Sequence, residues 1–372
     1  MTDKDWMINW LKIENFKSIK NQKINCKRLN IFIGKPNVGK SNILEAVATL
    51  GACNSWDEKF LSEFIRYKRF ANLFYDNDRK KNILVNSNLG YFFVRYYSNS
   101  IDSYEAINAT SLELIDETDP SKKSNYNLDE LKRSFIELKN KHKNIPEPSL
   151  QSYQTFINSE GKKIGHDYTE NKFFGNIKKY EFKKNQNYTG KNAGFLVPPN
   201  GNNTITMLEN NPTILDEVVD IFYSYGLQLL IDNELNELQV QKTVGNRVYK
   251  IPYSMCADTL QRYIFNLLAI KTNKNSVIIL EEPEAHSFPT YISNIGEEIV
   301  KDKQNQYFIA THSPYLLKEF VETADREDLA LFICDYKNYE TIIKELSNEE
   351  IDNLIDTKAD IFYNLRAFQN ND

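Results

Sequence analysis

Gly34-Lys-Pro-Asn-Val-Gly-Lys-Ser41 is a complete match to the pattern G-x-x-x-x-G-K-[ST] of a phosphate-binding loop. The two glycines let the backbone curl tightly, so that several N–H groups point into one concavity. Lys40 places a positive charge where the β- and γ-phosphates of a nucleotide lie, and the Ser41 hydroxyl is suited to bind Mg²⁺. The predicted nucleotide-binding residues are Gly34, Lys35, Pro36, Asn37, Val38, Gly39, Lys40, Ser41 and Asn42.

The flanks of this loop have the character that the motif requires. Residues 29–33 are a short apolar run that predicts a buried strand, and residues 42–50 have helical spacing that ends at Gly51. A strand, a loop and a helix in this order place phosphates at a helix N-terminus. A chance match in a surface turn is the alternative, and both flanks argue against it.

Composition limits the classes of function. The chain has 372 residues, which predicts one elaborated domain or two. Its net charge of −5 argues against DNA binding over the whole surface but leaves room for a local basic patch. The four cysteines lie far apart without a C-x-x-C pair, the first residues do not resemble a signal peptide, and no apolar run approaches a membrane span. We therefore expect a cytoplasmic protein with no membrane partner.

The pattern of apolar residues predicts an α/β fold with a mostly parallel sheet and helices on its faces. Residues 10–16 and 20–26 are expected to pair as strands, and residues 82–98 to form a hairpin. Helical periodicity over 128–138 predicts an inserted arm. Further along, a helix is expected at 214–225 and a hairpin at 227–242. The last third alternates between helices and strands, predicted at 258–271, 277–280, 289–301, 306–310, 314–321 and 329–334.

A second acidic motif follows the predicted strand 276–280. That strand ends in Glu281-Glu-Pro-Glu284, and carboxylates at the carboxyl end of a parallel strand lie where ligands bind in open α/β sheets. Glu281 is positioned to hold Mg²⁺, and Glu282 to polarise an attacking water or accept its proton. The alternative is an acidic turn that caps the next helix.

A histidine motif follows the predicted strand 306–310. This strand ends in Thr311-His-Ser-Pro314, and a histidine at a strand tip can donate to a γ-phosphate oxygen. His312 lies 30 residues after Glu282, which allows one helix and one neighbouring strand between them. A purely structural histidine is the alternative.

In their order, these motifs resemble those of ABC-type ATPases of the SMC, RecF and OLD kind, which are often labelled AAA-family ATPases. The opening Leu11-Lys-Ile-Glu-Asn-Phe-Lys-Ser18 is also similar to the first strand of that group, and the resemblance covers roughly residues 7–55 and 195–335. It implies a P-loop NTPase fold of ABC type, with a mixed sheet, flanking helices and an inserted helical and β arm. The implied division is 1–100 for the first part of the ATPase head with Walker A, 101–195 for the arm or lid, 196–335 for the second part with Walker B, and 336–372 for a helical tail.

The resemblance also implies a function. ATP and Mg²⁺ are the expected cofactors, with Lys40 on ATP, and Ser41 and Glu281 on the metal. Glu282 matches the catalytic glutamate, and His312 matches the switch histidine. Two heads are expected to sandwich ATP in a homodimer or higher oligomer, and relatives of this type serve DNA repair or antiphage defence beside a separate nuclease or toxin.

Some positions depart from the family pattern. Glu281 stands where an aspartate is usual, and a longer acid still reaches the metal. The signature motif is expected within 254–262, where Ala257 replaces the serine that touches phosphate. Asp258 and Thr259 are then the polar candidates at the start of a helix, although Asp258 is equally well explained as an N-cap. No glutamine loop is assigned.

Rival interpretations have weaker support. A GTPase needs an N-K-x-D box, and the nearest candidate, residues 273–276, lacks its aspartate. A scaffold that uses ATP only as a conformational switch stays open, because slow hydrolysis would serve it. The 38 residues after Cys334 are too few for a nuclease domain, and the acidic residues there are best read as a solvated helix face.

The segment Lys162–Lys191 carries eight lysines interleaved with aromatic residues. Lysines for phosphates and aromatic rings for stacking would make a DNA surface. A small β-subdomain with an aromatic core and solvated lysines is the favoured alternative.

Overall fold

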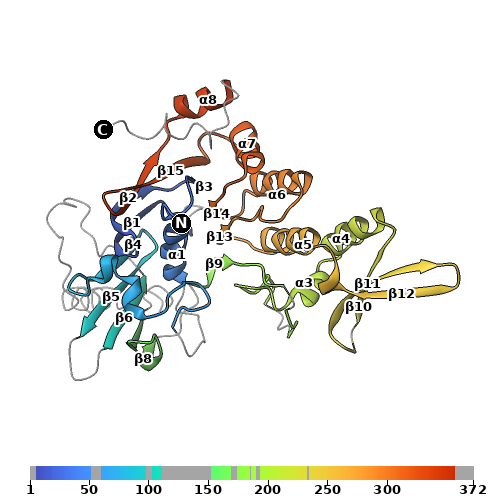
Figure 1. Cartoon of the computed structure of the whole chain (residues 1–372), viewed down its shortest axis with the longest axis horizontal. Helices are drawn as coiled ribbons and strands as arrows, with labels where there is room; N and C mark the ends of the chain where they lie inside the picture. The colour runs from blue at the N-terminus through green and yellow to red at the C-terminus, as the bar shows by residue number, and fades with distance from the viewer. Residues whose placement is uncertain are drawn as a thin grey trace, which may run out of the picture. The chain divides into compact units, whose positions relative to one another are not determined.

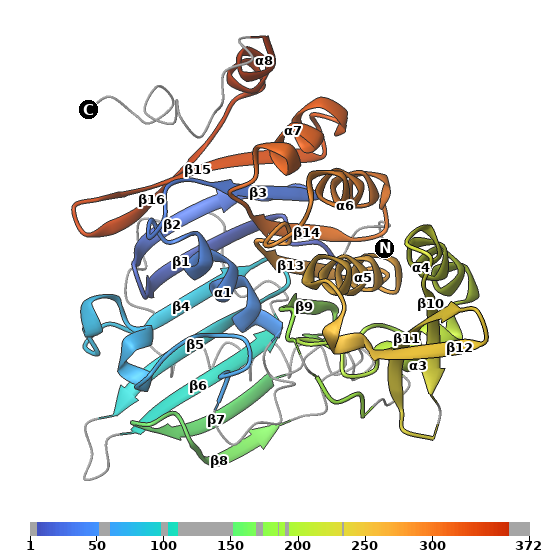
Figure 2. The same ribbon diagram turned by 45° about the vertical axis from the view of Figure 1, so that its right-hand side comes forward.

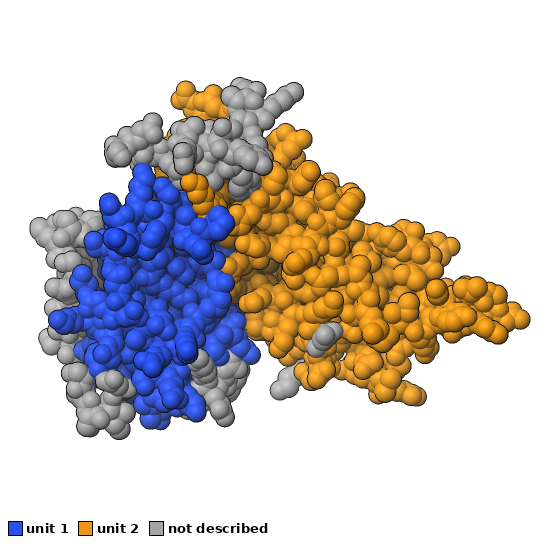
Figure 3. Space-filling model, viewed as in Figure 1, with its two compact units in different colours: residues 1–26, 36–177, 334–343 blue, residues 27–35, 178–333, 344–372 orange. Residues whose placement is uncertain are grey.

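The computed structural model describes residues 6–51, 60–97, 103–110, 152–168, 174–184, 186–189, 193–232 and 234–356, which fall into two compact units (Figure 3). Unit 1 comprises residues 1–26, 36–177 and 334–343, and unit 2 comprises residues 27–35, 178–333 and 344–372. The chain crosses between the units within the phosphate loop, since Lys35 belongs to unit 2 and Pro36 to unit 1.

Unit 1 is built on an antiparallel sheet of seven strands in the order β2-β1-β4-β5-β6-β7-β8. The strands are β1 (Trp10–Phe16), β2 (Ile19–Asn25), β4 (Ile83–Ser87), β5 (Gly90–Tyr97), β6 (Ser103–Thr110), β7 (Ser152–Asn158) and β8 (Lys163–Tyr168). Short 3₁₀ helices lie at Phe70–Leu73, Tyr75–Asn77 and Phe174–Asn176. Along β1, Leu11 and Ile13 are buried and alternate with more exposed polar residues, as expected of a strand with one face on the core.

Helix α1 (Lys40–Gly51) packs against β1, β4 and β5 of this sheet (Figure 2). The helix is buried around most of its circumference, which explains its dense apolar composition. Its one buried carboxylate, Glu45, is paired with Lys17 and with the Arg66 Nε at 2.8 Å. A buried charge is tolerated only when it is paired in this way.

Most of the second sheet lies in unit 2, and its strand order is β16-β15-β3-β14-β13-β9. Its strands are β3 (Leu29–Ile33), β9 (Ile177–Tyr180), β13 (Val277–Glu281), β14 (Gln306–Ala310), β15 (Leu329–Lys337) and β16 (Glu340–Glu345). Strands β15, β3, β14 and β13 are parallel, and β3 and β14 are buried at every position. Continuous apolar runs are typical of parallel strands that are covered on both faces.

Helices α5, α6 and α7 follow one another beside this sheet (Figure 1). The helices of unit 2 are α3 (Thr204–Asn210), α4 (Pro212–Ser224), α5 (Asp258–Lys271), α6 (Pro289–Lys301), α7 (Pro314–Thr323) and α8 (Asn348–Asp356), with a 3₁₀ turn at Tyr253–Met255. A separate antiparallel sheet joins β10 (Gln228–Asp232), β11 (Glu237–Val244) and β12 (Arg247–Pro252). A cluster of buried hydrophobic side chains, to which β3, β14 and α5 contribute, runs through the described part of the unit.

The predicted α/β fold is confirmed, and so are the predicted helices and strands of the last third. Two differences stand out. Residues 103–110, 152–158 and 163–168, expected in an inserted arm, extend the sheet of unit 1, and the helix predicted at 128–138 lies outside the described residues. Residues 340–345, expected in a helical tail, form strand β16 instead, because Thr341-Ile-Ile343 pairs beside β15. Among the described helices, none has the length and apolar character needed to cross a membrane.

Candidate functional site

Strands β3, β14 and β13 of unit 2 lie side by side (Figure 2), and several of the predicted site residues follow them. The parallel register places Glu281 opposite Ala310, and Ala310 opposite Phe32. Because the three strands end in line, the residues that follow them emerge at the same edge of the sheet. These are Gly34 and Lys35 after β3, Glu282 after β13, and His312 after β14.

The tip of β13 holds Glu282 in an unusual backbone conformation. Its φ is +47°, a left-handed value that costs a non-glycine residue on the order of 1 kcal/mol. The Glu282 N–H donates to the Ala310 carbonyl at 2.9 Å, which ties this turn to β14. The carboxylate Oε1 then lies 3.6 Å from Nε2 of His312, and both side chains are reachable by solvent. A carboxylate and an imidazole therefore face each other at the predicted position.

Glu284 organises the turn that carries His312. Its Oε1 accepts hydrogen bonds from the Thr311 hydroxyl at 2.6 Å, the His312 N–H at 2.7 Å and the Ser313 N–H at 3.1 Å. Burial raises the pKa of this carboxyl, and the hydrogen bonds from Thr311 and His312 oppose that shift. Sequence reasoning gave Glu284 no role, although its place in the acidic motif was visible.

Glu281 has a neighbour that the sequence did not predict. Lys179 on β9, the strand beside β13, is buried, and its Nζ lies 3.6 Å from Oε2 of Glu281. Lys178, the preceding residue, instead bonds to the Asn273 Oδ1 at 2.6 Å and to the Ser276 hydroxyl at 3.2 Å. Lys179 and Glu281 are about 100 positions apart in the sequence, so no local sequence pattern predicts their contact.

The rest of the phosphate loop belongs to unit 1. Lys40 is the first residue of α1 and is buried, and the Ile43 N–H bonds back to the Gly39 carbonyl at 3.2 Å. Burial raises the pKa of the Cys334 thiol to about 12, and the positive charge of Lys40 opposes this shift. The predicted Lys40 and Ser41 thus occupy the helix N-terminus, as the motif requires.

The signature-like residues are engaged in contacts of their own. Asp258 bonds to the Arg262 Nε at 2.8 Å and lies 3.9 Å from the Lys184 Nζ, and the hydrogen bond from Arg262 helps to lower its pKa. The N-cap of α5 is Ala257, so Asp258 does not serve as a side-chain cap. Thr259 donates its hydroxyl to the His286 carbonyl at 2.7 Å, which links α5 to the loop after β13.

The described part of the lysine-rich segment holds both buried lysines and exposed ones, such as Lys183 and Lys184. Lys178 and Lys179 are buried, and the Tyr180 ring is in the core of unit 2. Phe182 packs edge-on against Phe265 at 5.8 Å between ring centroids. Lys178 and Lys179 are therefore not available as surface contacts for phosphate, because they lie among buried polar groups. DNA binding through the rest of the segment stays a prediction.

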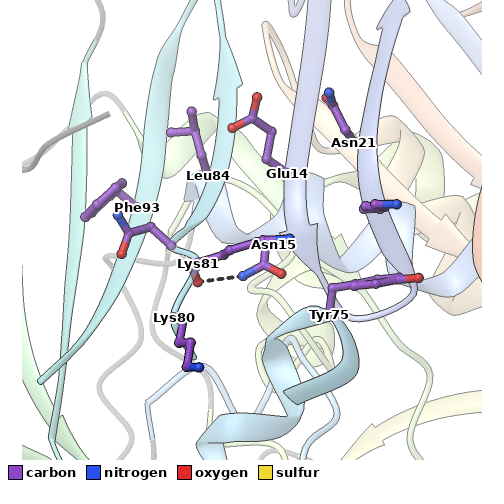
Figure 4. A pocket seen from close by; sticks show the side chains of 10 residues that line it. Glu14, Asn15, Asn21, Tyr75, Lys80, Lys81, Leu84 and Phe93 are labelled. Atoms are coloured by element: carbon purple, nitrogen blue, oxygen red, sulfur yellow. Dashed lines mark hydrogen bonds between the residues drawn. The ribbon is translucent and has the colours of Figure 1, made fainter. Parts of the chain in front are cut away.

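A pocket of about 340 Å³ lies elsewhere in unit 1 (Figure 4). Asn15 points into it and donates to the Lys81 carbonyl at 2.6 Å. The other lining residues are Glu14, Lys20, Asn21, Tyr75, Lys80, Asn82, Leu84 and Phe93. None of the predicted nucleotide residues lines this pocket, so it does not mark the candidate site.

Comparison with known proteins gives one family match, one relative and two solved structures. The family model described as AAA ATPase domain matches residues 7–216. A Helicobacter pylori (strain ATCC 700392 / 26695) protein named ATP/GTP phosphatase is 22% identical over 353 residues, which cover 86% of this chain and 88% of that protein. Among solved structures, an Smc head bound to the C-winged helix domain of ScpA has a TM-score of 0.47 at 13% identity, covering 93% of this chain and 99% of that one. A second Smc head, described with the C-terminal domain of ScpA derived from Pyrococcus furiosus, has a TM-score of 0.45 at 12% identity, with coverage of 95% and 99%.

The family match spans more than half of the chain and contains the whole phosphate loop. It also contains β1 and the helix α1 that follows the loop. The acidic and histidine motifs lie beyond it, so their assignment depends on the geometry of unit 2. On the family match, this chain belongs to the AAA ATPase domain family.

Proposed function

We propose that the protein hydrolyses ATP to ADP and phosphate. Residues 34–42 would hold the triphosphate, with the Lys40 ammonium on its β- and γ-phosphates. Glu282 would orient the attacking water and accept its proton at the carboxylate. His312 would donate a hydrogen bond from its ring to a γ-phosphate oxygen.

The 3.6 Å approach of Glu282 Oε1 to His312 Nε2 is the observation that carries this proposal. Hydrolysis needs a group that positions water and a donor that senses the γ-phosphate, and the two must be close enough to act on one reacting centre. The strained backbone at Glu282 adds support, because strain of this kind concentrates at functional sites.

The residues present also fit Mg²⁺. The described residues include no group of three or more His, Cys, Asp or Glu side chains that could hold a metal ion. Mg²⁺ does not need one, because it is usually held by one or two protein oxygens together with phosphates and water. Glu281, at the tip of β13, and the Ser41 hydroxyl are the proposed protein ligands. Held there, Mg²⁺ would supply positive charge that stabilises the phosphates during hydrolysis.

Two variants test the assignment of roles. Lys40→Ala is expected to lose ATP binding, measured by calorimetry, because the loop then lacks its phosphate cation. Glu282→Gln is expected to bind ATP as the wild type does but to lose at least 100-fold in turnover, since a neutral amide does not accept the proton. Turnover at the wild-type rate in Glu282→Gln would refute the proposed role. A wild-type rate that is itself near zero would favour the switch or scaffold alternative.

The same calorimetric measurement tests whether the protein prefers adenine or guanine nucleotides. The Helicobacter pylori relative is named for both ATP and GTP. In this chain, the only N-K sequence near the expected position, Asn273-Lys-Asn-Ser276, lacks the aspartate that recognises guanine. We therefore propose a preference for ATP, and parallel titrations with GTP would reveal the opposite preference.

We propose further that ATP drives self-association, with Asp258 and Thr259 of one copy facing the triphosphate held by another. Both residues stand in the first turn of α5, whose N–H groups favour an anion. The dimer would regulate a separate effector, such as a nuclease or toxin in antiphage defence. Light scattering of the Glu282→Gln protein, with and without ATP, tests the association. Proteins or nucleic acids that copurify only with ATP present would identify the effector.

A further inference from the structure

Two hydroxyl side chains from opposite ends of the sequence contact the phosphate loop inside unit 1. The Thr341 Oγ1, on β16, donates to the Val38 carbonyl at 2.9 Å. The Ser18 Oγ lies 2.6 Å from Thr341 Oγ1, and the Asn42 Nδ2 donates to Ser18 Oγ at 2.7 Å. We call the Ser18 and Thr341 side chains the hydroxyl clasp.

Counting protons gives these contacts a direction. A hydroxyl has one proton to donate, and Thr341 uses it on Val38. The bond between the two hydroxyls is therefore donated by Ser18 to Thr341. The resulting chain runs from the Asn42 amide through Ser18 and Thr341 to the Val38 carbonyl. It begins and ends on the phosphate loop and encloses residues 39–41.

The clasp is itself held by backbone contacts. The Thr341 N–H donates to the Ser18 carbonyl at 2.8 Å, so the two hydroxyls are fixed beside each other independently of their side-chain bond. Thr341 is fully buried, which removes competition from water for its hydrogen bonds. The hydroxyls are therefore in place before any ligand arrives.

The clasp also explains why position 39 is glycine. Its φ is +98°, which disfavours any residue with a Cβ. A Cβ built there would lie 2.0 Å from Thr341 Oγ1 and 2.8 Å from Ser18 Oγ. The loop backbone thus approaches the two hydroxyls more closely than a side chain would permit.

We propose that the hydroxyl clasp preorganises the loop for phosphate, so that Ser18 and Thr341 are positioning residues for the nucleotide. The inference rests on the proposed role of residues 34–42 in binding the triphosphate. A loop that is already curled loses less conformational freedom on binding, and that saving appears as affinity. The two residues need not touch the nucleotide to act in this way.

The test compares the dissociation constant for ATP, measured by calorimetry, in matched variants. Thr341→Val keeps the shape of the side chain but breaks the chain of hydrogen bonds, and is expected to weaken ATP binding about tenfold, or about 1.4 kcal/mol. Thr341→Ser retains the hydroxyl and is expected to restore affinity to within about twofold of the wild type. Thr49→Val removes a different buried hydroxyl, on α1, which donates to the Ala46 carbonyl, and is expected to leave affinity unchanged.

Further arms separate the possible failures. If Thr341→Val lowers only the melting temperature and binds ATP like the wild type, the clasp is structural and the inference is wrong. Should Thr341→Val fail to fold, Ser18→Ala removes the middle link, and wild-type affinity in that variant would overturn the inference equally. Lys40→Ala tests the proposed function alone, because full ATP binding by that variant would mean that residues 34–42 are not the nucleotide site.

Discussion

Replacing Glu284 by alanine removes the acceptor that shapes the His312 turn. The Thr311 hydroxyl and the His312 N–H lose the partner shown for them, whereas the Ser313 N–H keeps a bond to Thr311 Oγ1 at 2.9 Å. Hydrogen bonds to charged groups contribute about 1.5–3 kcal/mol each. Two such losses, offset by relief of the buried charge, predict a fall of about 3 kcal/mol in the stability of this part of unit 2.

The same change should slow turnover more than it weakens ATP binding. His312 is placed by its own backbone N–H, so a relaxed turn moves the imidazole away from the Glu282 carboxylate that lies 3.6 Å from it. We expect turnover to fall at least tenfold and the dissociation constant for ATP to rise by a smaller factor, because residues 34–42 are untouched and only the His312 contact is weakened. Steady-state phosphate release and calorimetry measure the two quantities.

Glu284→Gln is the matched control. The amide oxygen can still accept from Thr311 and His312, so turnover should stay within about threefold of the wild type.

Burial raises the pKa of Glu284, so its carboxyl group binds a proton more tightly in the native state than in the unfolded chain. The buried charge therefore costs stability above the raised pKa, and the cost disappears as the pH falls towards 4.5. A Gln variant as impaired as the Ala variant, or an Ala variant with wild-type turnover and melting, would refute the argument.

Three further changes have defined outcomes. Lys179→Met removes a cation 3.6 Å from Glu281, so half-maximal turnover should need about threefold less Mg²⁺; an unchanged titration would contradict this. Gly39→Ala should weaken ATP binding at least 100-fold, because its Cβ would collide with Thr341, and near-normal calorimetric affinity would count against the loop geometry. Burial lowers the pKa of Lys178 to about 8 from 10.5, so the unfolded state binds more protons between these values. The free energy of unfolding of the wild type should therefore rise by about 3 kcal/mol from pH 8 to 10.5 relative to that of Lys178→Met, as measured by chemical denaturation. The same pH dependence in both proteins would show that burying the Lys178 charge costs no stability.

The sequence predicted those parts of the candidate site that consist of contiguous residues. The phosphate loop and the motifs around Glu282 and His312 each follow an apolar strand, so their place at a strand end was predictable. The chemistry assigned to them stays a prediction. Strand β16 was missed because four of its six residues are polar and it follows a polar turn, where the local pattern favoured a helical tail. Lys179 and Thr341 were missed for another reason: their partners are about 100 and 300 residues away, and only the folded sheets bring them together.

The register of the parallel strands in unit 2 determines which side chains lie close together at the ends of these strands. Glu281, Ala310 and Phe32 lie in one row across three parallel strands, and Glu282 and His312, the proposed catalytic residues, follow their strands within two positions. Side chains alternate between the two faces of a strand, and both faces of β14 are buried. A slip of one residue in β14 would therefore exchange the side chains packed on its two faces and carry His312 away from Glu282. The apolar residues of β14 are all buried, which makes such a slip costly. The hydrophobic core therefore fixes the distance between the proposed catalytic groups, and this explains how two short motifs, 30 residues apart, can define one site.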